Sequence, residues 1–387
     1  MDGLERSEGP SSHHRRRLLQ KEILGWYSKH GRRLPWRESS DPYRVWISEI
    51  MLQQTTVAAV VPYFERFLSR FPDVQTLARG PESDVLRHWE GLGYYSRARN
   101  LYRAANTIVE RHGGRFPDTP EELLTLPGVG RYTAGAVASF GFGLQAPIVE
   151  ANTLRLYSRL MGLTVDPYST AGQKQLWGFA EWISVTSSPA DLNQALMDIG
   201  SSVCRPQEPK CGECPLAKFC RANASGEQSS IPIAKKRPAK TPVTEVLFAV
   251  ERDERYLLRQ YDPGERWAGL WDFARFQVDE NGGVLDQPAA AELLFEPAAG
   301  YATIPESWIE GLRERTGLKA RSVAGLREIR HVVTRFQIRL LCFHVSEVGG
   351  RLRSGAGYRW VSREELLELP LSKTGRQVAV LLGQIRQ

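Results

Sequence analysis

Four cysteines lying close together are the residues whose types and spacing point most directly to chemistry. They are Cys204, Cys211, Cys214 and Cys220, a C-x6-C-x2-C-x5-C pattern within 17 residues. A structural zinc usually takes two short Cys-x2-4-Cys pairs, whereas this pattern has one tight pair and uneven outer spacings. Four thiolates can instead hold a [4Fe-4S] cluster. We therefore expect an iron-sulfur cluster here, with zinc as the alternative.

A disulfide framework is a poorer explanation for these cysteines. The fifth cysteine, Cys342, lies far away in a strand-like run, and the chain shows no secretory signal. Residues 1–17 contain several basic residues without a following apolar stretch, so we expect a disordered basic arm. No apolar run approaches the roughly 18 to 20 residues of a membrane span. We expect a protein that binds no membrane and resides in a bacterial cytoplasm or a nucleus.

Length and composition set bounds on the architecture. The chain has 387 residues, which allows two or three domains of roughly 100 to 200 residues each. Hydrophobic residues make up 42% and charged residues 25%, as in ordinary soluble globular proteins. The net charge of +7 and pI of about 9.2 favour a polyanionic partner, and support nucleic acid only together with a recognisable site.

The hydrophobic pattern divides the chain into two regions. From about Leu18 to Gly200 the periodicity is helical, and the cysteine loop closes this region. Residues 222–242 have linker composition, and the pattern beyond them is β-rich. The expected strands lie at 243–250, 256–260, 273–278, 336–345 and 358–361, and the expected helices at 306–315, 363–368 and 374–384. We predict an all-helical domain over residues 18–221 and an α/β domain over residues 243–387.

A glycine-rich turn joins two of the expected helices. The sequence Leu-Pro-Gly-Val-Gly at 126–130 lies between a helix ending near Thr125 and one beginning near Arg131. Gly128 and Gly130 permit a sharp turn and present backbone N–H groups at a helix N-terminus, where a phosphate can bind. Because tight turns need glycine in any case, the DNA-binding interpretation depends on the cysteine loop beside it.

Another expected helix carries a candidate acid. Asp41 and Pro42 are a typical N-cap and first helical residue. Residues 45–55 are apolar nearly all round, so we expect Glu49 to be buried with them. Burial raises the pKa of a carboxyl group and suits it to act as a general acid near neutral pH. The alternative is an ion pair with an arginine such as Arg37.

These segments together resemble the MutY-type adenine DNA glycosylases of the endonuclease III superfamily. The resemblance spans roughly residues 18–220 and rests on the cysteine loop and on the motifs at 34–37, 45–55, 91–99 and 126–136. It implies a helix-hairpin-helix fold, a six-helix barrel packed against an iron-sulfur domain, with adenine flipped from bent double-stranded DNA into the cleft between them. Flipping is required because the N-glycosidic bond cannot be attacked inside the stack.

The resemblance also implies roles for individual residues. Glu49 protonates adenine N7, Tyr132 stabilises the developing charge on the sugar, and Asn152 positions water or the second carboxylate. The expected base and DNA contacts are Arg37, Leu52, Gln54, Thr55, Tyr94, Gly128 and Gly130. Tyr94 resembles a residue that wedges into the duplex, with plain core packing as the alternative. Lyases of the superfamily carry a lysine where this chain has Tyr132, so no Schiff base is expected and we predict a monofunctional enzyme.

The second carboxylate departs from the family pattern. Glycosidic cleavage with two carboxyl groups needs one near the anomeric carbon, as nucleophile or to stabilise the oxocarbenium ion. The family has Val-Asp-Gly-Asn where this chain has Val-Glu-Ala-Asn at 149–152, so Glu150 is one methylene longer. A misplacement of about 1 Å can cost about a hundredfold in rate. Either the backbone accommodates Glu150 and the enzyme works, or the chain binds the lesion without efficient cleavage.

The C-terminal region resembles, more weakly, the Nudix-like domain of the same family. The resemblance rests on Trp-Ala-Gly-Leu-Trp-Asp-Phe at 267–273. A Nudix hydrolase needs several glutamates on one helix to hold magnesium, but Arg315 follows an isolated Glu314, so we expect no pyrophosphatase activity. The family recognises 8-oxoguanine through a Phe-Ser-His loop, where this chain has Thr334 for hydrogen bonding and Arg335 for a phosphate contact. An ordinary strand entry with a solvated arginine is the alternative.

We therefore predict a monomeric base-excision-repair enzyme, an adenine DNA N-glycosylase acting on adenine opposite 8-oxoguanine or guanine. The competing hypotheses are a mismatch glycosylase for thymine or uracil and a lesion-binding protein made slow by Glu150. Since the hydrolysis needs no electron transfer, we expect the [4Fe-4S] cluster to be structural and to position DNA.

Overall fold

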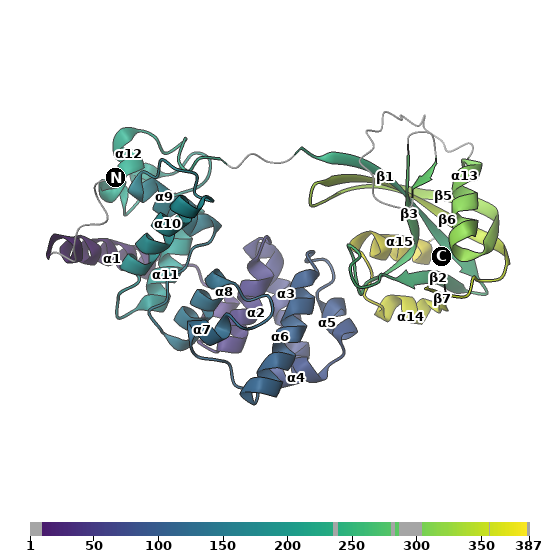
Figure 1. The fold of residues 1–387 in the computed structure, drawn as a ribbon, viewed down its shortest axis with the longest axis horizontal. Helices are drawn as coiled ribbons and strands as arrows, with labels where there is room; N and C mark the ends of the chain where they lie inside the picture. The colour runs from purple at the N-terminus through teal and green to yellow at the C-terminus, as the bar shows by residue number, and fades with distance from the viewer. Residues whose placement is uncertain (1–9, 235–238, 280–282, 286–303, 356, 385–387) are drawn as a thin grey trace. The chain divides into compact units, whose positions relative to one another are not determined.

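The computed structural model describes residues 10–234, 239–279, 283–285, 304–355 and 357–384 (Figure 1). The chain forms two compact units, one holding residues up to Gly80 with Ser96–Lys236, the other holding Pro81–Tyr95 with residues from Arg237 onward. The first is helical and the second is built on a sheet, as the sequence predicts. Helix α5 (Glu82–His88) falls in the second unit by this division, although we expected it within a continuous helical domain.

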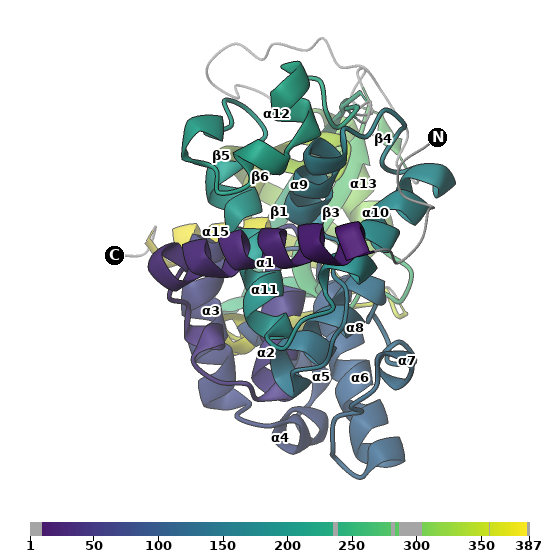
Figure 2. The same ribbon diagram turned by 90° about the vertical axis from the view of Figure 1, so that its left-hand side faces the viewer.

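Helices make up the first unit, and α1 packs across α11 (Figure 2). In chain order they are α1 (Pro10–His30), η1 (Pro35–Arg37), α2 (Pro42–Leu52), α3 (Val57–Arg70), α4 (Val74–Arg79), α6 (Ser96–His112), α7 (Pro120–Leu123), α8 (Arg131–Ala136), η2 (Val137–Gly141), α9 (Ala151–Met161), α10 (Thr170–Ile183), α11 (Pro189–Asp198), η3 (Ile199–Val203), η4 (Cys211–Glu213), η5 (Ala217–Phe219) and α12 (Arg221–Ser225). The described residues include no helix long and apolar enough to cross a membrane.

Local chemistry fixes both ends of α2. The side chain of Asp41 accepts a hydrogen bond from the backbone N–H of Tyr43 at 2.9 Å, and Pro42 begins the helix, as the sequence predicts. At the other end the buried guanidinium of Arg97, on α6, donates to the carbonyls of Ile50 and Met51 at 2.7 and 2.9 Å. These bonds satisfy C-terminal carbonyls that have no partner within the helix.

The N-terminal segment corrects one expectation. The sequence predicts a disordered arm over residues 1–17. Residues 1–9 lie outside the described part of the chain, and from Pro10 onward the segment is helix α1. Trp182 donates from Nε1 to Ser12 Oγ at 3.1 Å, and Gln20 donates from Nε2 to the carbonyl of Ile183 at 2.9 Å. These bonds attach α1 to the end of α10, and a composition argument cannot detect such tertiary contacts.

The segment expected to be a linker is partly built into the helical unit. Helix α12 already begins at Arg221, and Ile231 is 7% exposed. The carbonyl of Ile231 accepts a hydrogen bond from Arg159 Nε at 2.9 Å. The first strand then begins at Thr241.

In the described ranges, seven strands form one sheet at the core of the second unit. Its strands are β1 (Thr241–Arg252), β2 (Arg255–Gln260), β3 (Trp271–Val278), β4 (Val284–Leu285), β5 (Leu318–Val333), β6 (Phe336–Gly350) and β7 (Tyr358–Val361), in the order β4-β3-β2-β1-β6-β5 with β7 beside β2. Strands β1 and β6 are parallel, and the other pairs are antiparallel. The sequence did not predict β5, which pairs along its length with β6.

Helices cover both faces of this sheet. Side chains of α13 (Glu306–Thr316) pack with one apolar layer, and those of α14 (Arg363–Glu368) and α15 (Lys373–Gln384) pack with the other (Figure 1). Strand residues alternate between the two layers, as in Val246 and Leu247. The second unit is therefore the α/β domain that the sequence predicts.

Candidate active site

A pocket of about 1310 Å³ in the helical unit brings Glu49 and Glu150 into one lining. Its walls come from η1, α2 and the turn after it, the glycine turn, and the starts of α8 and α9. The other predicted site residues in the lining are Arg37, Leu52, Gln54, Thr55, Gly128, Gly130, Tyr132 and Asn152. The fold thus collects in one place residues that lie as far apart in the sequence as Arg37 and Asn152.

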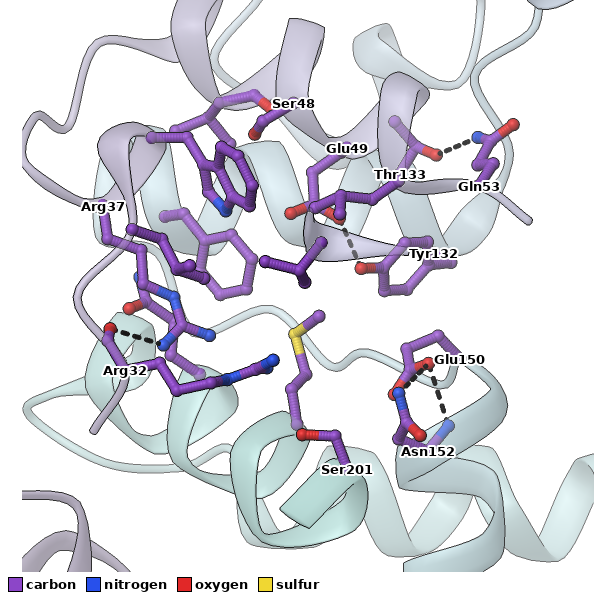
Figure 3. A pocket seen from close by; sticks show the side chains of 18 of the residues that line it. Arg32, Arg37, Ser48, Glu49, Gln53, Tyr132, Thr133, Glu150, Asn152 and Ser201 are labelled. Carbon is purple, nitrogen blue, oxygen red and sulfur yellow. Dashed lines mark hydrogen bonds between the residues drawn. The ribbon is translucent and has the colours of Figure 1, made fainter. Parts of the chain in front are cut away.

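Glu49 is a buried acid with a hydroxyl partner. The residue is 3% exposed, and the Tyr132 hydroxyl donates to its Oε2 (Figure 3). Burial raises the pKa of Glu49 to about 7, and the charge of Glu150 adds to the rise, whereas the Tyr132 hydrogen bond and the charge of Arg37 oppose it. Burial and the carboxylates also raise the pKa of Tyr132, so its hydroxyl keeps its proton. The predicted burial of Glu49 is confirmed.

Glu150 caps the N-terminus of α9. Its carboxylate accepts hydrogen bonds from the backbone N–H groups of Asn152 at 2.9 Å and Thr153 at 2.8 Å, and from Asn152 Nδ2 at 3.2 Å. Its own N–H donates to Thr153 Oγ1 at 2.9 Å, which completes a capping box. Burial raises the pKa of Glu150, and the hydrogen bonds from Asn152 and Thr153 oppose that rise. Both carboxylate oxygens are held, on the side of the pocket across from Glu49 (Figure 3).

Arg37 pairs with Asp198, and the alternative of an ion pair with Glu49 is wrong. Its Nη1 and Nη2 lie 2.8 and 3.0 Å from the two oxygens of Asp198. Arg32 approaches the same carboxylate, with Nη2 at 2.6 Å from Oδ1. Although burial opposes it, Arg37 holds the pKa of Asp198 below its ordinary value. The shared carboxylate fixes two guanidinium groups along the pocket wall, and sequence reasoning missed it.

A second missed residue, Arg155, orients Asn152. Its Nη2 donates to Asn152 Oδ1 at 2.9 Å and to the Gly200 carbonyl at 2.6 Å, while its Nε donates to the Cys204 carbonyl at 2.7 Å. With Oδ1 occupied in this way, the amide nitrogen of Asn152 faces Glu150. A Cβ atom on Gly200 would lie 2.8 Å from the Asn152 carbonyl oxygen, so only glycine allows this close approach.

The turn after α2 adds polar groups to the lining. Gln54 has a φ of +57°, a left-handed conformation that is uncommon for a residue with a side chain. Thr55 Oγ1 accepts from Arg97 Nη2 at 3.3 Å, and Gln53 Nε2 donates to Thr133 Oγ1 at 3.4 Å (Figure 3). Gln53 and Thr133 were not among the predicted site residues.

The glycine turn has the predicted hairpin form. It connects α7 to α8, and Gly128 has a φ of +76°. A Cβ atom there would also lie 2.6 Å from Asn100 Cβ, so the glycine is required both by conformation and by space. Gly130 is the N-cap of α8, with an extended φ of −96°. The N–H groups of the first turn of α8 can therefore bind an anion.

The four cysteines of the loop line one small cavity. All four are free thiols, and Arg159, 3% exposed, donates from Nη1 to Cys204 Sγ at 3.3 Å. Within the described ranges, no three His, Cys, Asp or Glu side chains are close enough to bind one metal ion. A tetrahedral zinc needs its ligands on one point at about 2.3 Å, whereas a cube binds each thiolate through a separate iron. Four thiols around one cavity are a set of donors that a [4Fe-4S] cluster can take.

Three of the predicted DNA contacts lie in the second unit. Tyr94 is 45% exposed and has a φ of +47°, directly after Gly93 with a φ of +71°. Thr334 and Arg335 form the two-residue turn of the β5–β6 hairpin, since Val333 pairs with Phe336. Tyr94, Thr334 and Arg335 thus lie in loops and turns, and their contacts with DNA stay predictions.

The family models assign each unit to a class of protein. Residues 47–181 match the HhH-GPD superfamily base excision DNA repair protein, and residues 245–379 match the NUDIX domain. Glu49, Glu150 and the glycine turn fall within the first match, so the carboxylates belong to a DNA glycosylase of the helix-hairpin-helix type that carries a Nudix domain.

Comparisons with individual proteins narrow this class to one family. The adenine DNA glycosylase of Buchnera aphidicola subsp. Acyrthosiphon pisum is 37% identical over 264 residues, which cover 68% of this chain and 75% of that protein. The human adenine DNA glycosylase is 43% identical over 218 residues, 54% of this chain and 40% of that protein. The chain belongs to the adenine DNA glycosylase family.

The helical unit also has a similar solved structure. A thermostable thymine-DNA glycosylase is 31% identical, with a TM-score of 0.51, over 56% of this chain and 99% of that one. The shared fold therefore serves different bases, and base choice depends on the pocket rather than on the scaffold.

Proposed function

We propose that this chain hydrolyses the N-glycosidic bond of adenine mispaired with 8-oxoguanine or guanine in double-stranded DNA, as a monomer. The observation that carries the proposal is buried Glu49, hydrogen-bonded by Tyr132 and separated by the pocket from Glu150. The names of the relatives support adenine as the base. Residues 18–221 would form the glycosylase domain and residues 243–387 the lesion-recognition domain, working in a cytoplasm or a nucleus.

The two carboxyl groups divide the chemistry. Protonated Glu49 donates its proton to N7 of the flipped adenine, and the electron pair of the C1′–N9 bond leaves with the base. The Tyr132 hydroxyl then stabilises the Glu49 carboxylate, and Glu150 stabilises the positive charge on the sugar. Water adds to the anomeric carbon and gives its proton to a carboxylate, leaving adenine and an abasic site. Position 132 carries a tyrosine and not the lysine of the lyases, so no Schiff base forms there and the DNA strand stays intact.

The remaining lining residues hold the substrate. Arg37 and Arg32, both anchored by Asp198, present N–H donors along the wall to the acceptor edge of a flipped base. Gln54 would help to hold the base, and Leu52 and Thr55 on the same turn would contact the DNA. The N–H groups after Gly128 and Gly130 would bind a phosphate. Tyr94 would act as a wedge in the duplex. Thr334 and Arg335 would contact the strand that carries 8-oxoguanine.

Cys204, Cys211, Cys214 and Cys220 would hold the [4Fe-4S] cluster. When bound, the cluster would cross-link and stiffen the loop, and no step of the proposed hydrolysis passes through it. The chain's own contribution is the bond of Arg155 to the Cys204 carbonyl, which joins the loop to Asn152.

Single-turnover cleavage tests this proposal. Duplexes carrying A opposite 8-oxoguanine, G or T, and T or U opposite G, are incubated with excess enzyme and treated with alkali to reveal abasic sites. We expect cleavage only of A opposite 8-oxoguanine and G, and its loss in Glu150→Gln. Cleavage of T or U would favour the alternative specificity. Tight binding without cleavage, restored by Glu150→Asp, would mean that the natural chain is a lesion-binding protein.

A further inference from the structure

A row of arginine and aromatic side chains in the second unit runs to the tip of the β5–β6 hairpin. The Cζ atom of Arg275 lies 4.3 Å from the centroid of the Trp267 ring, and that of Arg266 lies 5.4 Å from it. Arg266 also stacks on Phe336 at 4.4 Å, and Arg335 stacks on the same ring at 5.1 Å. Guanidinium groups and aromatic rings thus alternate from the core to the surface.

Carboxylates neutralise the arginine charges less and less from the inner to the outer end of this row. At the inner end the Arg275 side chain is 2% exposed and lies 2.5 Å from Glu245 and 3.3 Å from Asp272. Arg266 is 27% exposed and reaches Glu245 only at 3.9 Å. Arg335 is exposed, and in the described part of the chain no carboxylate pairs with it. Within the described residues, Arg266 is therefore only weakly compensated by Glu245, and Arg335 carries a charge that no carboxylate pair neutralises.

The pKa of a neighbouring histidine is lowered in part by the same arginines. His331 lies on β5 opposite Ile338. Burial lowers its pKa to about 4, and the charges of Arg275 and Arg266 contribute to the shift although Glu245 opposes it. At neutral pH the imidazole is neutral, so the positive potential at this end of the sheet comes from the arginines.

The backbone holds the tip in a fixed conformation. Thr334 adopts a φ of +53°, and its hydroxyl donates to the Val333 carbonyl at 2.7 Å. The backbone N–H of Thr241, at the start of β1, donates to the Arg335 carbonyl at 2.8 Å. A β-branched residue in the left-handed region persists only where its surroundings impose it. The hairpin therefore presents Arg335 beside Phe336 before any ligand arrives.

We propose that Arg266 and Arg335, stacked together on Phe336, form a clamp for one phosphodiester group of the DNA backbone, an inference that rests on the proposed DNA substrate. A guanidinium offers a planar set of donors that matches phosphate, and stacking reduces the entropy lost on binding. The Thr334 hydroxyl already donates its proton to the Val333 carbonyl, so that proton is not available to a base edge. The hairpin then grips the strand rather than reading the edge of a base.

Salt-dependent binding tests the clamp. Equilibrium affinity for a duplex with A opposite 8-oxoguanine is measured against salt concentration in the Glu49→Gln background, in which the substrate stays intact. Each phosphate contact contributes about 0.9 to the slope of log K against log salt. We expect Arg335→Gln and Arg266→Gln each to lower the slope by about 1, and the double variant by about 2.

A matched control separates the clamp from general charge loss. Arg330 is 76% exposed on β5 and bonds to Glu328 at 2.6 Å, so Arg330→Gln removes the same charge from a neutralised pair and should leave the slope unchanged. A duplex with G in place of 8-oxoguanine should bind more weakly, and the affinities of wild type and of the clamp variants should fall by the same factor. The reason is that a contact to the DNA backbone carries no information about the base.

Two results would overturn the clamp. One is an unchanged salt slope in both single variants. The other is loss of the 8-oxoguanine preference in Arg335→Gln at an unchanged slope, which would make Arg335 a reader of the base. Because binding is measured without cleavage, a wild type that binds the mismatch but cannot cleave it would refute the proposed function and leave the clamp supported.

Discussion

The protonation state of Glu49 sets an upper pH limit on catalysis. Only the protonated carboxyl can give a proton to adenine, and burial places its pKa at about 7. The single-turnover rate constant should be constant below pH 7 and fall tenfold per pH unit above it. At pH 9 about 1% of Glu49 is protonated, so the rate should be about a hundredfold below its maximum. The rate constant is measured with excess enzyme at pH values between about 5.5 and 9. The reaction is stopped at a series of times, and alkali then reveals the abasic sites.

The same shift predicts a change in stability. A native pKa of about 7 against an ordinary 4.5 means that the folded chain binds the proton more tightly than the unfolded one. This stability is fully present below pH 4.5 and is lost as the pH rises to about 7. The rise from 4.5 to about 7 corresponds to about 3 kcal/mol, and because Glu49 is 3% exposed, solvent screening does not reduce this value. Glu49→Gln should thus be about 3 kcal/mol more stable than wild type at pH 8 and equal below pH 4.5.

Hydrogen exchange of the α2 amides, compared between variant and wild type at the same pH, measures this difference in stability. It reports on the helical unit and does not require two-state unfolding of the whole chain. Glu49→Gln should also abolish cleavage at every pH. A rate that stays level to pH 9, or a Gln variant that cleaves, would show that Glu49 is not the acid. Equal protection of both proteins at pH 8 would show that burial does not shift its pKa.

Three further changes test the groups around this acid. Tyr132→Phe removes a hydrogen bond that lowers the pKa of Glu49, so the alkaline limb of the pH–rate profile should move upward; an unmoved limb would contradict the bond. Gly200→Ala forces a Cβ against the Asn152 carbonyl and should slow single-turnover cleavage about tenfold, with cluster absorbance retained as the control for folding. Cys214→Ser should reduce the bound iron and the absorbance near about 400 nm, measured by metal analysis and spectroscopy, whereas stoichiometric zinc in a colourless wild type would refute the cluster.

Elements specified by local chemistry could be predicted from the sequence. The N-cap of α2, the glycine turn and the helices of the second unit depend on short-range signals such as Asp-Pro, Gly-x-Gly and helical periodicity. Strand β5 lacks such a signal because most of its residues are exposed or half-buried and its pairing with β6 contains irregularities. Backbone pairing with a neighbour, rather than its own apolar alternation, makes it a strand.

The site shows the same division between residue types and their pairing. The burial of Glu49 was predictable because a helix that is apolar nearly all round is itself buried, together with the carboxyl group it carries. The partner of Arg37 was not, because Asp198 lies 161 positions away and meets it only through the packing of α11. Arg155 likewise gains its role from the fold, which brings the Gly200 carbonyl to the same Nη2 that donates to Asn152 Oδ1.

The N-cap geometry of Glu150 explains how a longer carboxylate can serve this pocket. Short side chains are preferred at N-caps because they reach the first free N–H groups of the helix, and Glu150 reaches the same groups from an extended backbone, with φ −127° and ψ −178°. The helix therefore fixes the charge, and the extra methylene is absorbed between the backbone and the carboxylate. Glu150→Asp should fold normally, since aspartate caps well, so its rate reports the position of the charge. Rates within about tenfold of each other would support this account, and a gain of about a hundredfold in the variant would mean that the methylene displaces the charge.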